Sequence, residues 1–170
     1  YPQCLAEAVE RLAELRERLT AAGWRVESSD PLRVTVAAPR GVTGQELAGQ
    51  LRRQGVECEY ADRDFLVLMA TPENTPEELA QAAAALGQCP GEANSPQLPL
   101  ARGERACSIR QAAFAPRETV DAAHSLGRVC GLPTVGCPPA IPIAVSGERI
   151  TPEALALFAY YGIEQVEVLA

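Results

Sequence analysis

The most consequential absence in this 170-residue sequence is lysine, because all 15 of its Lys+Arg residues are arginine. Without a lysine amine, no side chain can form a Schiff base with a carbonyl substrate or with pyridoxal phosphate. The sequence therefore excludes lysine-dependent pyridoxal phosphate and aldolase chemistry within this chain.

Histidine and paired cysteines are also scarce. His124 is the only histidine, and its place in a short helical stretch favours a packed or surface side chain over a catalytic one. Zinc sites normally contain close Cys/Cys or Cys/His pairs, and the sequence has neither. We expect reduced thiols that mostly fill the core, with an extracellular disulfide set as the less favoured alternative. The six cysteines are Cys4, Cys58, Cys89, Cys107, Cys130 and Cys137.

The chain also lacks a net positive charge and long apolar runs. The net charge of -7 and the isoelectric point near 4.8 argue against nucleic acid or an anionic membrane surface as a partner. No apolar run approaches the roughly 20 residues that a membrane span needs, and no charged stretch followed by an apolar one predicts a signal segment. We expect a cytoplasmic protein. Since the chain opens at Tyr1 rather than at methionine, we also expect a piece of a longer polypeptide.

The first half of the chain predicts three helices. Residues 2–22 carry apolar side chains at three- and four-residue spacing, which is typical of a helix with one buried face. A second helix is expected from Thr43 to Gly55 and a third from Thr75 to Gly87. In both, a glutamate follows the threonine by three residues, which is the pattern of a capping box.

Four strand candidates alternate with these helices. The segment FLVLMA is apolar throughout, which predicts a strand covered on both sides. The expected order is α-β-β-α-β-β-α, an α+β unit over residues 1–88 with helices packed on a mostly antiparallel sheet. The candidates are WRVES (24–28), LRVTVAA (32–38), VECEY (56–60) and FLVLMA (65–70).

Proline and glycine then interrupt the pattern over residues 89–103, which we interpret as a linker. Residues 104–170 predict a second, small α/β unit. A short helix should begin at Ser108, and a final helix should begin at Thr151 and stop at Gly162. The strand candidates of this unit are ETV (118–120), RVCG (128–131), IPIAV (141–145) and IEQVEVLA (163–170).

No complete active site emerges from the residues alone. The stretch GVTGQELAG has neither dinucleotide-binding nor Walker glycine spacing. Glu57 and Glu59 could mimic an acid/base pair, but a solvated strand face is the favoured interpretation. The arginines Arg52, Arg53 and Arg63 could bind an anion, although adjacent helical residues point in different directions.

The densest charged cluster lies in the second unit. Such residues near strand ends often fix loops through ion pairs and hydrogen bonds to carbonyl groups, and we favour that structural role over a substrate-facing one. Both interpretations stay open at this point. The cluster consists of Arg110, Arg117, Glu118, Arg128 and Glu148.

Two runs in the second unit, SIRQAAFAPRETV and LGRVCGLPTVGCPPAIPIAVSGERIT, resemble the C-terminal domain of the bacterial Orn/Lys/Arg decarboxylases. That family shows a Pro-Arg-Glu-Ala-Phe-Phe-Ala-like segment, an Ala-Val-Gly-Arg-Ile segment, a Tyr-Pro-Pro-Gly-Ile-Pro stretch and a closing Pro-Gly-Glu. The corresponding segments here are Ile109 to Ala115, Leu126 to Val129, Cys137 to Pro142 and Ser146 to Glu148.

The sequence departs from this pattern at three positions. Cys137 stands where an aromatic residue is usual, Ala140 replaces glycine, and Gln111 stands where glutamate is common. The first 88 residues are similar, more loosely, to the small domain of fold-type-I pyridoxal phosphate enzymes.

The resemblance implies a non-catalytic C-terminal part of a decarboxylase of arginine, lysine or ornithine, an enzyme class of polyamine metabolism. Pyridoxal phosphate and the large domain that binds it through a Ser-x-His-Lys segment would belong to the parent protein, before Tyr1. This part would help to close the active site and support dimerisation, and it would hold no catalytic, cofactor-binding or metal-binding residue. The candidate entrance or structural residues are Arg110, Arg128, Cys137, Pro138, Pro139, Pro142 and Glu148.

Within this interpretation the Cys137–Pro142 loop would lie near the substrate entrance, and Glu148 would favour a cationic substrate electrostatically. Two other functions remain open. One is a stand-alone ligand-binding or regulatory module, and the other is a degenerate enzyme remnant that acts as a scaffold.

Overall fold

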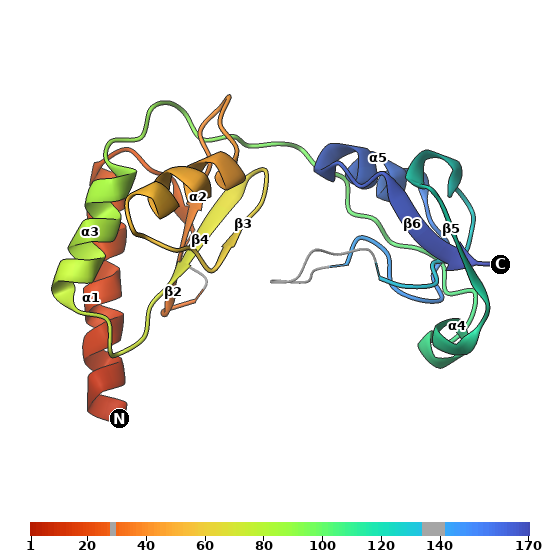
Figure 1. The fold of residues 1–170 in the computed structure, drawn as a ribbon, viewed down its shortest axis with the longest axis horizontal. Helices are drawn as coiled ribbons and strands as arrows, with labels where there is room; N and C mark the ends of the chain where they lie inside the picture. The colour runs from red at the N-terminus through yellow and green to blue at the C-terminus, as the bar shows by residue number, and fades with distance from the viewer. Residues whose placement is uncertain (28–29, 134–141) are drawn as a thin grey trace. The chain divides into compact units, whose positions relative to one another are not determined.

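A computed structural model describes residues 1–27, 30–133 and 142–170. The chain divides into two compact units, Tyr1–Ser95 and Pro96–Ala170 (Figure 1). The boundary lies inside the segment 89–103, and the first half of that segment packs on the first unit. There the Asn94 amide N–H donates to the Ala38 carbonyl at 2.7 Å, and the Asn94 side chain donates to Asp64 Oδ1 at 2.9 Å.

The first unit has the predicted order of helices and strands. Its helices begin where the sequence places caps, because Thr43 and Thr75 each form a complete capping box with Glu46 and Glu78. The elements are α1 (Pro2–Ala21), β1 (Val26–Glu27), β2 (Arg33–Ala37), α2 (Gly44–Arg53), β3 (Tyr60–Ala61), β4 (Phe65–Met69) and α3 (Pro76–Leu86).

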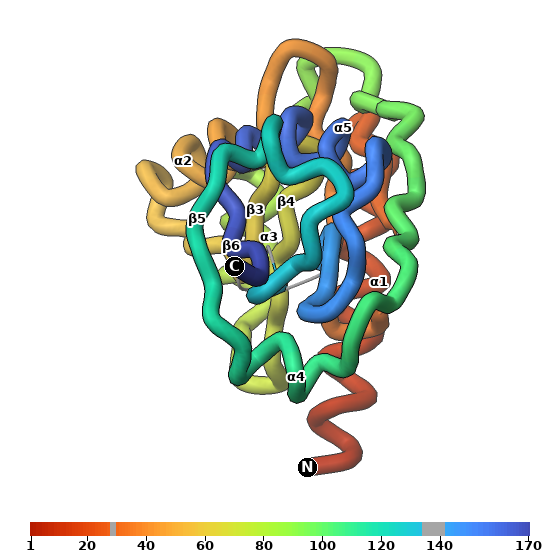
Figure 2. The backbone as a smooth tube through the Cα atoms, turned by 90° about the vertical axis from the view of Figure 1, so that its right-hand side faces the viewer, coloured from red at the N-terminus to blue at the C-terminus, as the bar shows by residue number. Residues whose placement is uncertain are grey.

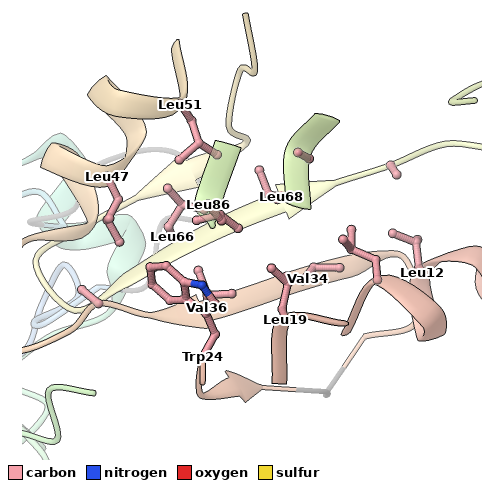
Figure 3. Close-up of a cluster of buried hydrophobic side chains, with 14 residues drawn as sticks. Leu12, Leu19, Trp24, Val34, Val36, Leu47, Leu51, Leu66, Leu68 and Leu86 are labelled. Atoms are coloured by element: carbon pink, nitrogen blue, oxygen red, sulfur yellow. The ribbon is translucent and has the colours of Figure 1, made fainter. Parts of the chain in front are cut away.

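The four strands form one antiparallel sheet in the order β1-β2-β4-β3. Val34 pairs with Leu68 and Val36 with Leu66, so these four buried side chains share one face of the sheet. All three helices contribute leucines to the same core, together with Trp24, whose indole N–H donates to the Gly87 carbonyl at 3.0 Å (Figure 3). The prediction of an α+β unit with helices on an antiparallel sheet is confirmed.

The opposite face of this sheet corrects one expectation. In β4 only Leu66 and Leu68 are buried, whereas Phe65 and Val67 are half-buried and Met69 is 48% exposed. The prediction of a strand covered on both sides is wrong, because the helices of this unit pack on one face. The predicted strand at 56–60 is also too long, since only its last residue, Tyr60, belongs to β3.

The second unit contains a two-stranded antiparallel sheet and its own small core. Ser108 and Gln111 form a capping box before the first helix, and Gly162 ends the last helix in the left-handed conformation. The elements are α4 (Ile109–Phe114), β5 (Arg117–Asp121), the 3-10 turn η1 (Ala122–His124), α5 (Pro152–Tyr161) and β6 (Gln165–Leu169). The buried core residues are Ala122, Cys130, Ala144, Ile150, Ala154, Phe158, Val166 and Val168.

Two strand predictions in this unit are wrong. Residues 128–131 form only isolated bridges, Val129 with Arg149 and Cys130 with Val168. Ile143 to Val145 form bends and a turn entry, because the amide and carbonyl of Val145 bond locally to Glu148 and leave no ladder. Ile141 lies outside the described residues.

Candidate functional site

The best-defined feature among the motif residues is the Ser146–Gly147 turn. The Glu148 amide donates to the Val145 carbonyl at 3.1 Å, and the Glu148 carboxylate accepts a hydrogen bond from the Val145 amide at 3.2 Å. Two hydrogen bonds therefore close the turn, one through the backbone of Glu148 and one through its side chain.

Backbone bonds also join this turn to its neighbours. The Cys130 amide donates to the Glu148 carbonyl at 2.8 Å, and the Gly147 amide donates to the Cys130 carbonyl at 2.8 Å. On the other side, the Ala106 amide donates to the Gly147 carbonyl at 2.8 Å. The Ser-Gly-Glu segment is thus the point where three separate stretches of the second unit are tied together.

Gly147 is required in this turn for two independent reasons. Its φ of +91° lies in the region that residues with a side chain rarely adopt. A Cβ at this position would also lie 2.6 Å from the Cys107 carbonyl oxygen. The glycine of the motif is therefore explained by backbone geometry and by close packing.

The Cys130 thiol lies beneath the turn and is 1% exposed. Its Sγ donates to the Leu132 carbonyl at 3.0 Å, and burial, assisted by the nearby charge of Glu148, raises the pKa of Cys130 to about 11. A thiol held neutral in this way is a poor nucleophile and a poor metal ligand. Cys130 is a core residue, as predicted, whereas Cys58, Cys89 and Cys107 are half-buried and Cys4 is exposed.

The cluster of charged candidates divides into separate contacts. Arg128 Nη2 donates to Glu118 Oε1 at 2.6 Å and to the Leu169 carbonyl at 2.7 Å, which fixes the end of β6 against β5. Arg117 pairs with Glu167 at 3.1 Å and donates to the Ala113 carbonyl at 3.0 Å. Both arginines bind protein groups in the way that the structural interpretation expects.

Arg110 does not join these contacts. It is exposed, and its guanidinium lies 5.4 Å from the centre of the Phe114 ring, which is itself 81% exposed. Pro142 is exposed, whereas Cys137, Pro138 and Pro139 lie outside the described residues. The structure therefore brings Arg128 together with Glu118, and among the described candidates Arg110, Arg128 and Glu148 each have separate contacts.

The remaining candidates have structural partners. Glu57 binds Arg52 through several short contacts, which lower the pKa of Glu57 and raise that of Arg52. His124 is exposed, and its Nδ1 lies 3.5 Å from Asp121 Oδ2.

In the described part of the chain, no three His, Cys, Asp or Glu residues gather as metal ligands would. Among the same residues, no helix combines the length and the apolar character of a membrane span. The five described cysteines are free of disulfides.

Sequence reasoning missed one cavity in the first unit. It has a volume of about 220 Å³ and is lined by apolar and polar side chains that come mostly from α1, α3 and β4, with Glu57, Asn74 and Glu78 among the polar ones. Glu57 is paired with Arg52, and Glu78 caps α3, so neither carboxylate is free for a ligand. No sequence signal could have located it, because its walls come from distant segments.

Comparison with known proteins places the fold. The sequence matches no known family model and no curated protein. Among solved structures, the chain is similar to the constitutive lysine decarboxylase of Escherichia coli, with 13% identity and a TM-score of 0.68 over 99% of this chain and 41% of that one. It is also similar to the lysine decarboxylase of Francisella novicida, with 11% identity and a TM-score of 0.73 over 99% and 40% of the two chains.

Lysine decarboxylase A from Pseudomonas aeruginosa gives the same result, with 15% identity and a TM-score of 0.62 over 94% of this chain and 34% of that one. The chain thus has a fold found in lysine decarboxylases, as the sequence motifs predicted. It spans about two fifths or less of the length of these enzymes.

Proposed function

We propose that this chain is the C-terminal part of a pyridoxal-phosphate-dependent decarboxylase of a basic amino acid. The observation that carries the proposal is the extent of the fold match, which covers nearly all of this chain and only 34–41% of the decarboxylases. A shared single unit would be weak support, because one fold hosts many functions. The match here includes both units, and the motif order in residues 109–148 supports the same family independently.

The residues of this chain do not fit the cofactor itself. Pyridoxal phosphate enzymes hold their cofactor on a lysine, and the sequence contains none. Two arginines of the second unit's charged cluster, Arg117 and Arg128, also bind protein groups already. We therefore assign the cofactor and the reacting groups to a large domain outside this chain.

The role of this chain in the parent enzyme would be to help close the active site, to shape the substrate entrance and to support self-association. The Cys137–Pro142 segment, with three prolines that restrict the backbone, would form part of the entrance. Glu148 would add negative charge near it and attract a cationic substrate. We place the protein in the cytoplasm and in the metabolism that yields diamines and polyamines.

The test begins with the coding sequence upstream of Tyr1. An upstream domain with a Ser-x-His-Lys segment supports the proposal, and the longer protein should release CO2 from lysine, arginine or ornithine. The chain Tyr1–Ala170 alone should release none and should show no absorbance of a bound internal aldimine. A start codon within a few residues of Tyr1 would instead favour a stand-alone ligand-binding module.

The part assigned to Glu148 has its own test in the longer protein. Glutamine at this position keeps a side-chain oxygen that can accept from the Val145 amide, so Glu148→Gln removes the charge and leaves the turn. We expect a higher KM for the basic amino acid with little change in kcat. An unchanged KM in a correctly folded variant would restrict Glu148 to its structural role.

A further inference from the structure

Strand β5 is an exposed edge of the second unit's sheet. Among the described residues it pairs only with β6, and four of its five residues are exposed. Figure 2 shows β5 along the outer edge of this unit, with β6 on its inner side. The far edge of β6 is already occupied, because the Leu169 amide donates to the Val129 carbonyl and the Gly131 amide donates to the Glu167 carbonyl, both at 2.9 Å. Within the described part of this sheet, only the β5 edge can accept another strand.

The hydrogen bonds at the two ends of the sheet show which backbone groups point outward. The Ala122 amide donates to the Glu164 carbonyl at 2.8 Å, and the Ala170 amide donates to the Pro116 carbonyl at 3.0 Å. In an antiparallel ladder, residues facing the partner alternate along the strand. Residues 116, 118, 120 and 122 therefore face β6, and the amides and carbonyls of Arg117, Thr119 and Asp121 face away. These outward groups bond to no described residue.

The segment Arg117–Asp121 is complementary to itself. In an antiparallel pair centred on Thr119, Thr119 lies opposite Thr119 of the second copy, and Arg117 lies opposite Asp121. These are the residues whose backbone groups point outward, so each facing pair can exchange two hydrogen bonds. The same register places opposite charges directly across the strands, which stabilises a pair.

Other registers satisfy these groups less well. Moving the axis to Glu118 sets two like charges opposite each other, and moving it to Val120 leaves Arg117 without Asp121. A shift that changes the alternation would turn the outward groups of one strand away from those of the other. The pattern thus favours one two-fold arrangement.

We propose that two copies of this chain associate through their β5 edges, antiparallel about Thr119, to give a continuous sheet β6-β5-β5-β6. Apolar surface lies at both ends of the strand, where Phe114 is 81% and Leu126 55% exposed. An antiparallel pair brings the start of one β5 beside the end of the other. This inference rests on the proposed function and deepens its self-association by naming the surface.

Charge does not oppose this contact. Residues 1–95 hold 15 acidic residues against nine arginines, whereas residues 96–170 hold seven against six. The second unit is therefore nearly neutral, and two copies can meet there with little long-range repulsion. Strand β5 also has neither the proline nor the lysine that often protects an edge.

Sedimentation equilibrium of the chain Tyr1–Ala170 tests the pairing. The mass should rise with concentration from 18.1 kDa towards twice that value. Thr119→Pro removes an outward N–H at the axis, and since that N–H does not face β6, proline is compatible with the folded strand. We expect the dimer dissociation constant to rise about tenfold or more, because two hydrogen bonds at the axis are lost. Thr119→Val keeps the amide and should associate like the unchanged chain.

Charge reversal provides a second test of the dimer, and this test remains if Thr119→Pro fails to fold. Arg117→Asp and Asp121→Arg should each weaken the dimer, and the double variant should restore it. Arg117→Asp and the double variant both lack the ion pair with Glu167, so the loss of that pair does not account for a difference between them. A chain that stays monomeric, a dimer insensitive to Thr119→Pro in a folded variant, or an absence of rescue would overturn the proposal. None of these results bears on the decarboxylase assignment, which the longer protein tests.

Discussion

Arg128 and Glu118 are joined by a hydrogen bond of 2.6 Å between Nη2 and Oε1, and the same nitrogen donates to the Leu169 carbonyl at 2.7 Å. The guanidinium of Arg128 thus links its own segment to β5 through Glu118 and to the last residues of β6 through Leu169. Arg128 of the family-like motif therefore has a structural explanation in the second unit.

Replacing Arg128 should destabilise the second unit. Arg128→Gln loses the charge pair with the half-exposed Glu118 and weakens the bond to Leu169, so the free energy of unfolding should fall by about 1–2 kcal/mol. Denaturant titration followed by circular dichroism measures the change. Arg110→Gln is the matched control, because Arg110 lies beside the exposed Phe114 ring, and it should stay within about 0.5 kcal/mol. Equal losses in the two variants would contradict this role of Arg128.

Gly147→Ala should be more damaging than a change at another left-handed glycine. Gly127 has a φ of +75° and open space where a methyl group would lie, so alanine there costs about 1–2 kcal/mol from backbone strain alone. At Gly147 the methyl group would also overlap the Cys107 carbonyl, which adds about 1–3 kcal/mol. The difference between the two variants in thermal unfolding isolates the overlap. Similar melting temperatures would show that the turn moves to accommodate the methyl group.

Burial of Cys130 should make the second unit sensitive to alkali. The pKa of Cys130 is raised from the ordinary 9.0 to about 11 by burial and by Glu148. Its contribution to stability is complete below pH 9 and is lost as the pH rises towards 11, because only the unfolded chain releases the proton in that interval. Cys130→Ala should flatten the loss of stability across this interval. If Cys130→Ala leaves the fall of stability with pH unchanged, the thiol lies in a more polar environment than its burial indicates.

Gly44 should tolerate no side chain at all. A Cβ there would overlap the carbonyl oxygens of Phe65 and Asp62, because the start of α2 lies directly against the turn before β4. Gly44→Ala should lower the stability of the first unit by about 1–3 kcal/mol or more. Trp24, the only tryptophan, lies in this core and reports the unfolding by fluorescence. Gly91→Ala, with open space around it, should have little effect and serves as the control.

Much of the first unit could be predicted from local signals. The helix starts at Thr43 and Thr75 follow from capping boxes, which depend only on residues three apart. The alternation in β2 likewise places Val34 and Val36 inward. The continuous apolar run of β4 gave the wrong prediction of burial on both faces, because such a run does not reveal that helices cover only one face of the sheet.

The second unit was harder to predict because its backbone bonds connect distant segments. The segments around Cys130 and Val145 have the composition of strands, yet the first forms only isolated bridges, including one to β6, and Val145 bonds locally to Glu148. The pairing of Arg128 with Glu118 was one of several combinations that the charged cluster allowed. No periodicity distinguishes among them.

The sequence by itself determined the absence of lysine chemistry, the helix caps and the family resemblance, because each depends on residue identity or on neighbours within a few positions. Tertiary structure decided which charges pair, why Gly147 and Gly44 must be glycine, and which edge of β5 is open. These depend on contacts between segments far apart in the chain, where packing and the direction of backbone groups select one arrangement among many.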